Sequence, residues 1–281
     1  MHTLLPDLSQ DEAIELAAMR SLVNRPSFDT LDYAAPLEAP HHSASMVSVI
    51  GGGSGVPKPG LASLASHGVL FLDEAPEFST VTIDALRQPL ESGDITLSRA
   101  TATVQYPAKF QLVLAANPCP CGKGQIKTDA CQCAERIKAR YLAKISGPIL
   151  DRLDIQLSVR PVSPSVLTAG ATSVETSQQL RSKVTAARQR ASTRLGAHGF
   201  RLNAHVPGAV LRKELRINSS STKILDEALQ RGRISMRGYD KCLRLAWTNA
   251  DLAGRNEPNS SDVAKALWLR GVASQLMLSR G

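Results

Sequence analysis

Residues 68–78 read GVLFLDEAPEF, a short apolar run that ends in two adjacent carboxylates. Four consecutive apolar residues, 69–72, are typical of a strand that is buried on both faces of a parallel sheet. Such a strand would deliver Asp73 and Glu74 to its exposed end. There one carboxylate can hold Mg²⁺ and its neighbour can accept a proton from an attacking water. A capped turn after a strand gives the same pattern, so both interpretations stay open.

A second buried strand is predicted at FQLVLAA, residues 110–116, and it ends at Asn117. If the two strands are neighbours, the Asn117 amide lies beside the two carboxylates and can orient a water; the alternative is a common turn asparagine before proline. Residues 79–92 predict a helix that stops at Gly93. The partly alternating stretch ITLSRATATVQYPA predicts a β-hairpin at about residues 94–106.

The rest of the N-terminal part alternates in the same way. A capping box, Ser9-x-x-Glu12, opens a helix predicted at residues 9–24. A Pro-, His-, Ser- and Gly-rich stretch follows to residue 60 and predicts loop or insertion, with the insertion at about 36–60. A helix near 134–145 precedes ISGPILDRLDIQLSV, which predicts a short helix running into a third strand. We therefore expect an α/β domain with a parallel sheet over residues 1–160.

Residues 161–177 are rich in Pro, Gly, Ser and Thr and predict a linker. Beyond them the apolar periodicity predicts a C-terminal all-α domain over residues 178–281. Its helices are expected at 178–195, 221–231, 235–253 and 260–278.

Charge is divided unevenly along the 281 residues, whose net charge is +8. Residues 1–100 carry 5 Lys and Arg against 13 Asp and Glu, a net of −8, whereas residues 180–255 carry 16 against 5, a net of +11. Nucleic acid is the usual partner of so basic a region; solvated Arg-rich helix faces are the alternative. No apolar stretch is long enough to cross a membrane, and the N-terminus has no signal-peptide organisation, so we expect a cytoplasmic protein without a membrane partner.

Four of the five cysteines fall within fifteen positions, as a C-x-C-G segment followed by a second C-x-C segment. Four thiolates on one short loop can hold a tetrahedral Zn²⁺, although C-x-C is tighter than the usual C-x₂-C spacing. Free or redox-active thiols are the alternative. The four residues are Cys119, Cys121, Cys131 and Cys133. The fifth, Cys242, lies on a predicted apolar helix face and is expected in the core.

Two arginines are further candidates. Arg152, in GPILDRLD, is either a local salt-bridge partner or an arginine finger that stabilises phosphoryl charge in a neighbouring subunit. Arg237 opens the predicted helix SMRGYDKCLRLAWTNADLAG, and is either solvated or a phosphate-sensing residue.

The order of these motifs is informative. GVLFLDEAPEF, LRQPLESGDITLSRATATVQYPAKFQLVLAANPCPCG, ISGPILDRLDIQLSV and SMRGYDKCLRLAWTNADLAG follow one another along the chain. Together they resemble the magnesium-chelatase-like AAA+ ATPases, and within that family the ComM/YifB-type bacterial proteins, which are associated with competence and with helicase-driven branch migration. The resemblance covers essentially the whole chain. It implies an AAA+ parallel-sheet core with a C-terminal helical lid, and ATP hydrolysis coupled to movement on single-stranded or branched DNA in a hexameric ring.

By this resemblance, Asp73 and Glu74 match the Walker B pair and Asn117 matches the sensor 1 residue. Arg152 matches the arginine finger, which acts in a neighbouring subunit, and Arg237 matches the sensor 2 arginine. The cofactors implied are ATP and Mg²⁺, with Zn²⁺ open at the cysteines.

The resemblance also assigns two insertions. APHHSASMVSVIGGG (39–53) matches the family's helix-2 insertion, and ITLSRATATVQYPA matches its pre-sensor hairpin. In ring-shaped relatives these insertions face a central pore. DNA contacts are therefore expected at His41, His42 and Arg99, unless these residues are structural or solvated. The family has an arginine where this chain has Trp247, which predicts the loss of one basic contact.

The phosphate-binding loop is the main departure from the family. Its pattern, G-x-x-x-x-G-K-[ST], supplies backbone N–H groups, a lysine and a Mg²⁺-binding hydroxyl. In GGGSGVPKPG the only lysine, Lys58, lies between prolines. The family places this loop just before the segment that matches HTLLPDLSQDEA, so we expect a chain truncated before or within that loop, with weak ATP binding by itself. A chelatase-type motor subunit and a non-catalytic DNA-binding remnant of a decayed gene remain as alternatives.

Overall fold

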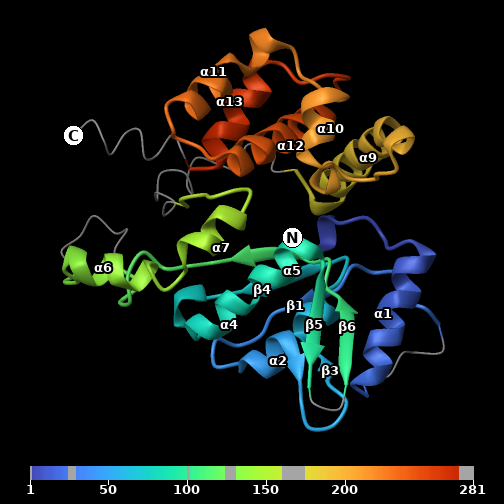
Figure 1. Ribbon diagram of the computed structural model, residues 1–281, viewed down its shortest axis with the longest axis vertical. Coiled ribbons are helices and arrows are strands. Elements are labelled where there is room, and N and C mark those ends of the chain that lie inside the picture. The colour runs from blue at the N-terminus through green and yellow to red at the C-terminus, as the bar shows by residue number, and fades with distance from the viewer. Residues whose placement is uncertain (1, 25–29, 100–101, 124–130, 160–174, 272–281) are drawn as a thin grey trace. The chain divides into compact units, whose positions relative to one another are not determined.

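The computed structural model forms two compact units, each with its own hydrophobic core (Figure 1). The α/β unit lies within residues 1–152. The helical unit combines residues 153–159 with the later part of the chain. The structure describes residues 2–24, 30–99, 102–123, 131–159 and 175–271.

A three-stranded parallel sheet lies at the centre of the α/β unit, in the order β1-β4-β7. These strands are β1 (Leu37–Glu38), β4 (Val69–Leu72) and β7 (Gln111–Leu114). Leu70 and Leu72 in the middle strand are fully buried. Leu72 is paired with Leu114, so β4 and β7 end at the same edge of the sheet. The two predicted strands and the α/β fold with a parallel sheet are confirmed.

Helices lie on either side of β4 in the sequence. The helix predicted at residues 9–24 is confirmed as α1 (Gln10–Leu22), with the expected capping box at Ser9. The single helix predicted at 79–92 is instead two short helices, α4 (Thr80–Ala85) and α5 (Arg87–Ser92). Pro89 explains the break, because it has no N–H to donate to Ala85 and its ring would clash with that carbonyl in a continuous helix.

Two β-hairpins pack against each other in this unit (Figure 1). The first comes from the stretch interpreted as an insertion, and the second from the stretch for which a hairpin is predicted. The Tyr106 hydroxyl donates a hydrogen bond of 2.7 Å to the Pro57 carbonyl and so joins the two. The strands are β2 (Gly51–Gly52) with β3 (Lys58–Pro59), and β5 (Asp94–Ser98) with β6 (Thr103–Pro107).

Glycine is required at the first of these hairpins. Gly51 has a φ of +114°, and a Cβ atom there would lie 2.6 Å from the Lys58 carbonyl oxygen. Any other residue would force the two strands apart. The hairpin is flanked by two short helices, α2 (Met46–Ile50) and α3 (Leu61–Leu64).

The chain leaves the sheet through α6 (Glu135–Leu142) and α7 (Gly147–Arg152). The strand predicted after α7 is wrong, because residues 153–159 form no strand. Their backbone groups bond to the helical unit instead. Gln156 N–H donates to the Leu269 carbonyl at 2.7 Å, and the Arg270 side chain donates to the Leu153 carbonyl at 2.8 Å.

The helical unit is built around α12 (Met236–Leu252), which packs against the four other α-helices described in this unit (Figure 1). Cys242 is buried in this core, as expected. The last predicted helix ends at Leu269, and residues 272–278 of that prediction lie outside the described residues. The other helices are α9 (Ser177–Leu195), α10 (Gly208–Lys213), α11 (Ser219–Gln230) and α13 (Ser260–Leu269). Single 3-10 turns lie at His2–Leu4, Ala75–Glu77, Gly196–His198 and Asn203–His205.

Candidate functional site

Asp73 and Glu74 are exposed at the carboxyl end of β4. Glu74 has left-handed backbone angles, φ 50° and ψ 42°, which residues other than glycine seldom adopt. Two hydrogen bonds hold the turn: Glu74 N–H donates to Asp73 Oδ1 at 2.9 Å, and Ala75 N–H donates to the Ala115 carbonyl at 2.8 Å. Unfavourable backbone angles of this kind concentrate at functional sites, because the surrounding structure must enforce them.

Asn117 is exposed three residues after the end of β7. Because β7 is hydrogen-bonded to β4 in parallel, Asn117 follows its strand at the same edge as Asp73 and Glu74. Backbone pairing continues beyond the strands, since Ala115 N–H donates to the Leu72 carbonyl at 3.0 Å. The structure therefore places one amide and two carboxylates at a single edge of the sheet.

His42, expected as a DNA contact, also lies at this edge of the sheet. Its Nδ1 atom lies 3.2 Å from Glu74 Oε2. The His41 ring packs against the His42 ring at a centroid distance of 4.0 Å, and His41 Nδ1 is hydrogen-bonded to the Ser43 hydroxyl at 2.8 Å. Both histidines follow β1, the other neighbour of β4. The available signal was the position of this His-His pair after a strand, but β1 is only two residues long and was not predicted.

The two candidate arginines lie elsewhere. Arg152 ends α7, where it forms an ion pair of 2.8 Å with Glu91 and donates to the Pro148 carbonyl. These partners come from α5 and α7, not from the strand ends. Arg237 is exposed in the first turn of α12, on the helical unit. The predicted site residues are thus divided between the two units.

The sulfur atoms of four cysteines gather in a four-cysteine cluster, and all lie within 4.8 Å of one another. The Sγ–Sγ distances between the first three are 3.2, 3.6 and 3.7 Å. A zinc ion with four thiolates at about 2.3 Å would place its sulfurs about 3.8 Å apart, so the arrangement fits a tetrahedral metal site. The cluster consists of Cys119, Cys121, Cys131 and Cys133.

Two cysteines of the four-cysteine cluster have pKa values shifted in opposite directions. A backbone N–H bond from Lys123, together with a bond from the Cys119 thiol, lowers the pKa of Cys121 to about 6. A hydrogen bond to Cys121, followed by burial, raises the pKa of Cys133 to about 11. Cys121 therefore forms a thiolate readily while Cys133 retains its proton, and a cation would be needed to hold several thiolates together.

Arg99, the third DNA-contact candidate, lies at the tip of the β5–β6 hairpin and is exposed. Its guanidinium reaches the neighbouring hairpin, because a Cβ atom on Gly52 would lie 3.4 Å from Arg99 Nη2. Val56, between the strands of the β2–β3 hairpin, is 66% exposed. The two adjacent hairpin tips thus present one basic and one apolar side chain to solvent.

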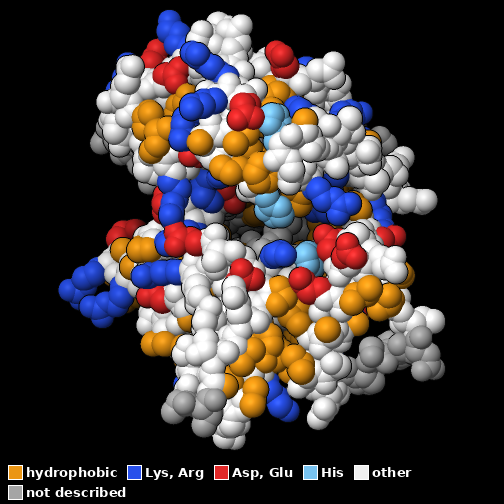
Figure 2. Space-filling view, turned by 45° about the vertical axis from the view of Figure 1, so that its right-hand side comes forward, with side chains coloured by type: hydrophobic (Ala, Val, Ile, Leu, Met, Phe, Trp, Pro, Cys, Tyr) orange, Lys and Arg blue, Asp and Glu red, His pale blue; other side chains and the backbone are white. Residues whose placement is uncertain are grey.

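The basic surplus of the helical unit is partly neutralised. On the face seen in Figure 2, its Lys and Arg side chains lie among acidic and apolar ones and do not form one continuous band. Arg212 forms an ion pair with Asp240, and Arg255 forms one with Asp262 at 2.5 Å. The net charge of this region therefore overstates its free positive surface.

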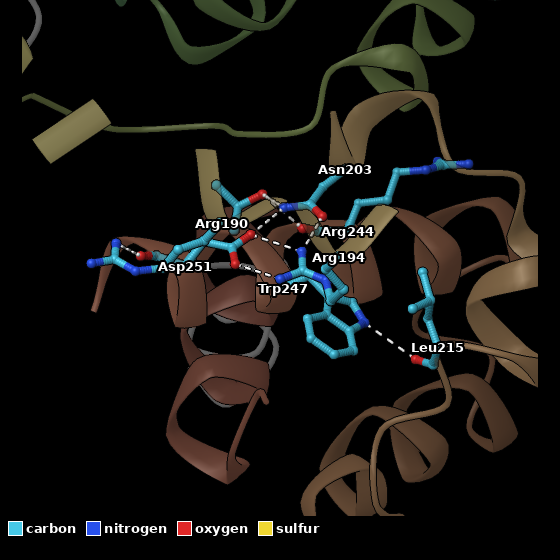
Figure 3. Close-up of polar contacts among 8 residues, drawn as sticks. Arg190, Arg194, Asn203, Leu215, Arg244, Trp247 and Asp251 are labelled. Atoms are coloured by element: carbon cyan, nitrogen blue, oxygen red, sulfur yellow. Dashed lines mark hydrogen bonds and ion pairs between the residues drawn. The ribbon is translucent and has the colours of Figure 1, made fainter. Parts of the chain in front are cut away.

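Trp247 belongs to the core of the helical unit (Figure 3). Its indole N–H donates to the Leu215 carbonyl at 3.2 Å, and the Arg194 guanidinium lies 4.2 Å from the ring centroid. Arg194 in turn forms a two-pronged ion pair with buried Asp251 and contacts Asn203. A tryptophan here fills the interior and stacks on a neighbouring arginine. Where the family has an arginine, this chain therefore buries an apolar ring.

The fold is that of an AAA+-like α/β protein with a parallel sheet, and the comparisons agree. The family model described as magnesium chelatase, subunit ChlI, matches residues 1–167, and that of the ChlI C-terminal region matches residues 174–270. The chain belongs to this magnesium-chelatase-like family.

Several proteins of similar sequence match nearly the whole chain. Competence protein ComM of Haemophilus influenzae is 41% identical over 274 residues, 97% of this chain. Uncharacterized protein YifB of Escherichia coli is 42% identical over 277 residues, 99% of this chain, and an uncharacterized protein of Mycobacterium tuberculosis is 47% identical over 268 residues, 95% of this chain. In each case the match covers 52% of the relative, so the chain spans about half the length of these proteins. No helix in the described part of the chain is long and apolar enough to cross a membrane.

Proposed function

We propose that the chain is part of an ATP-driven motor that moves on or remodels DNA. In this motor it supplies the sheet edge at which ATP is hydrolysed and the hairpins that contact DNA. The observation that carries this proposal is the single sheet edge at which Asp73, Glu74 and Asn117 meet. Family membership supports the ATPase part. The relative named competence protein ComM supports the DNA part. A DNA substrate implies the cytoplasm as the compartment.

At this edge Asp73 is the residue to hold Mg²⁺, because its carboxylate is exposed at the end of a buried strand. Bound there, Mg²⁺ would neutralise phosphate charge. Glu74 accepts a proton from the attacking water, and Asn117 orients that water. His42 holds the Glu74 carboxylate from the neighbouring strand end, so that the base keeps one orientation. Arg152 and Arg237 contact the phosphates, Arg152 from an adjacent subunit of a ring-shaped hexamer.

ATP binding also needs a phosphate-binding loop. Residues 1–281 contain no G-x-x-x-x-G-K-[ST] segment. Each charge-assisted contact that such a loop makes is worth roughly 1.5–3 kcal/mol. A polypeptide of these residues alone is therefore expected to bind ATP weakly, and hydrolysis requires that loop to be supplied.

The hairpin pair is the proposed DNA contact. Arg99 and Val56 at adjacent tips offer a phosphate contact and an apolar contact. We expect the purified chain to bind fluorescent single-stranded and branched DNA in an anisotropy titration, with an affinity that falls as salt rises. Arg99→Ala should weaken binding several-fold and reduce the salt slope by about one. The matched control is Arg20→Ala, which removes a partly buried arginine of α1 in the same unit, where it pairs with Asp32.

The same titration distinguishes the proposed DNA motor from the two alternative functions. A chelatase-type motor subunit, favoured by the name of the matching family models, would not bind DNA in any of these titrations. A non-catalytic DNA-binding remnant would bind DNA with no dependence on nucleotide, even after a phosphate-binding loop is supplied. Equal losses in Arg99→Ala and Arg20→Ala would contradict the hairpin assignment.

A further inference from the structure

We propose that the four-cysteine cluster binds one structural Zn²⁺, which fixes the chain segment that carries Asn117. The metal assignment is independent of the proposed function; only the catalytic use of Asn117 rests on it.

The geometry favours a single ion. All four sulfurs lie within 4.8 Å of one another, close to the edges of about 3.8 Å that a tetrahedral zinc site requires. Four sulfur ligands in tetrahedral array select zinc or iron. Thiolates that ligate different iron atoms of an iron–sulfur cluster would be spread more widely than those that share one ion. Because four thiolates fill a tetrahedral site, no position is left for substrate, and the site is structural.

Backbone donors already surround the sulfurs. The backbone N–H groups of Lys123, Cys133 and Cys121 act on the sulfurs of Cys121, Cys131 and Cys133, respectively, and favour their thiolate forms. Such N–H groups offset part of the negative charge of thiolate ligands. The Lys138 ammonium on α6 also lies close enough to interact with the charges of Cys119 and Cys131. A zinc ion with four thiolates carries a net charge of about −2, which these donors and this lysine stabilise.

Because the cluster lies close to Asn117 in the sequence, a bound metal would restrain the segment that carries this residue. Buried Cys119 follows Asn117 by two residues, and Cys133 precedes α6 by two residues. The described residues between β7 and α6, 115–123 and 131–134, form neither helix nor strand. One ion would therefore join the end of β7 to the start of α6, and would hold Asn117 at the sheet edge where few backbone hydrogen bonds do so.

Metal content of the full chain is the direct test. The chain is purified without chelator, and zinc and iron are measured by elemental mass spectrometry. We expect about one zinc per chain, replaceable by Co²⁺ with the visible spectrum of a tetrahedral tetrathiolate site. Cys121→Ser should lose the metal; Cys121 is exposed, so its removal leaves no core cavity. Cys242→Ser, which changes the buried cysteine of the helical unit, should keep it.

The second measurement tests positioning without any variant. Hydrogen exchange is followed in the wild-type chain before and after zinc removal by a chelator. Exchange should accelerate over residues 115–123 and recover when Zn²⁺ returns, while β4 stays protected. Metal-free protein that takes up no Co²⁺, iron in place of zinc, or a disulfide among these cysteines would each overturn the zinc assignment. Stoichiometric zinc with unchanged exchange over 115–123 would overturn the positioning of Asn117.

Discussion

The Nδ1 atom of His42 lies 3.2 Å from the Oε2 atom of Glu74, and this contact joins the residues that follow two neighbouring strands. Both side chains are partly exposed, so the contact alone contributes little to folding stability. Its effect is on orientation: a carboxylate that is held from one side can keep the other oxygen directed at a water. His42, expected as a DNA contact, is therefore also a candidate for positioning Glu74.

This contact predicts a selective loss of activity. In a polypeptide completed with a phosphate-binding loop, His42→Ala should lower the rate of ATP hydrolysis roughly 10- to 100-fold, because Glu74 loses its orientation. DNA affinity should stay unchanged. The neighbouring His41→Ala is the matched control, since His41 bonds to Ser43 and not to Glu74. A His42 variant with full activity and weakened DNA binding would support the original DNA assignment instead.

The ion pair beneath Trp247 predicts a stability effect in the helical unit. Asp251 is buried and accepts hydrogen bonds from Arg194 and Asn203 (Figure 3). Asp251→Ala should lower the free energy of unfolding by about 3–5 kcal/mol, because it leaves a largely buried guanidinium without its partner. Urea denaturation followed by circular dichroism measures the change.

A surface pair in the same unit provides the control. Glu227 and Arg231 lie 3.9 Å apart on α11, one turn from each other. Glu227→Gln should change the free energy of unfolding by less than about 0.5 kcal/mol. An Asp251→Ala variant that is no less stable than Glu227→Gln would show that the buried network does not stabilise the core.

Tyr239 predicts a dependence of stability on alkaline pH. Burial, followed by the hydrogen bond that its hydroxyl donates to Asp226 at 2.7 Å, raises the pKa of Tyr239 to about 12 from a usual value of 10. The folded protein therefore keeps this proton in a range where the unfolded chain has lost it. The stabilising contribution is complete below pH 10 and is lost as pH rises from 10 to 12.

Tyr239→Phe should remove that part of the pH dependence. We expect the stability of the wild type, measured by urea denaturation, to fall more steeply between pH 10 and 12 than that of the variant. Cys242, whose pKa is also raised by burial, is present in both proteins and cancels in the difference. Tyr33→Phe, at a side chain that is 43% exposed, should behave as the wild type. Parallel pH profiles for the wild type and Tyr239→Phe would contradict this assignment.

The long apolar runs made the sheet predictable. β4 and β7 are strands whose apolar residues are consecutive, and their parallel pairing follows from the helices between them. β1 was missed because two residues carry no periodicity. The strand predicted after α7 was wrong because alternating apolar residues do not by themselves provide a strand partner. Ile155, Leu157 and Val159 are exposed, and the Gln156 N–H bonds to the Leu269 carbonyl of the helical unit.

The candidate site was predictable to a similar extent. Asp73, Glu74 and Asn117 follow predicted strands, so their common edge could be inferred from the sequence. The four cysteines were recognised by spacing, but only the structure shows that their sulfurs converge. His42 could not be assigned, because its contact with Glu74 depends on the pairing of β1 with β4. The interior position of Trp247 could not be inferred from the sequence, because an aromatic residue on a helix can be buried or exposed.

One substitution decides whether ATP is hydrolysed at the sheet edge. A phosphate-binding segment with the pattern G-x-x-x-x-G-K-[ST] is joined ahead of residue 1, and the rate of phosphate release is measured with Mg²⁺ and branched DNA. Glu74→Gln should lower this rate by at least about 100-fold while ATP binding is retained, because only the proton acceptor is lost. The control Glu257→Gln, at an exposed loop of the helical unit, should keep the full rate. Equal rates for the Glu74→Gln and Glu257→Gln proteins would contradict the account.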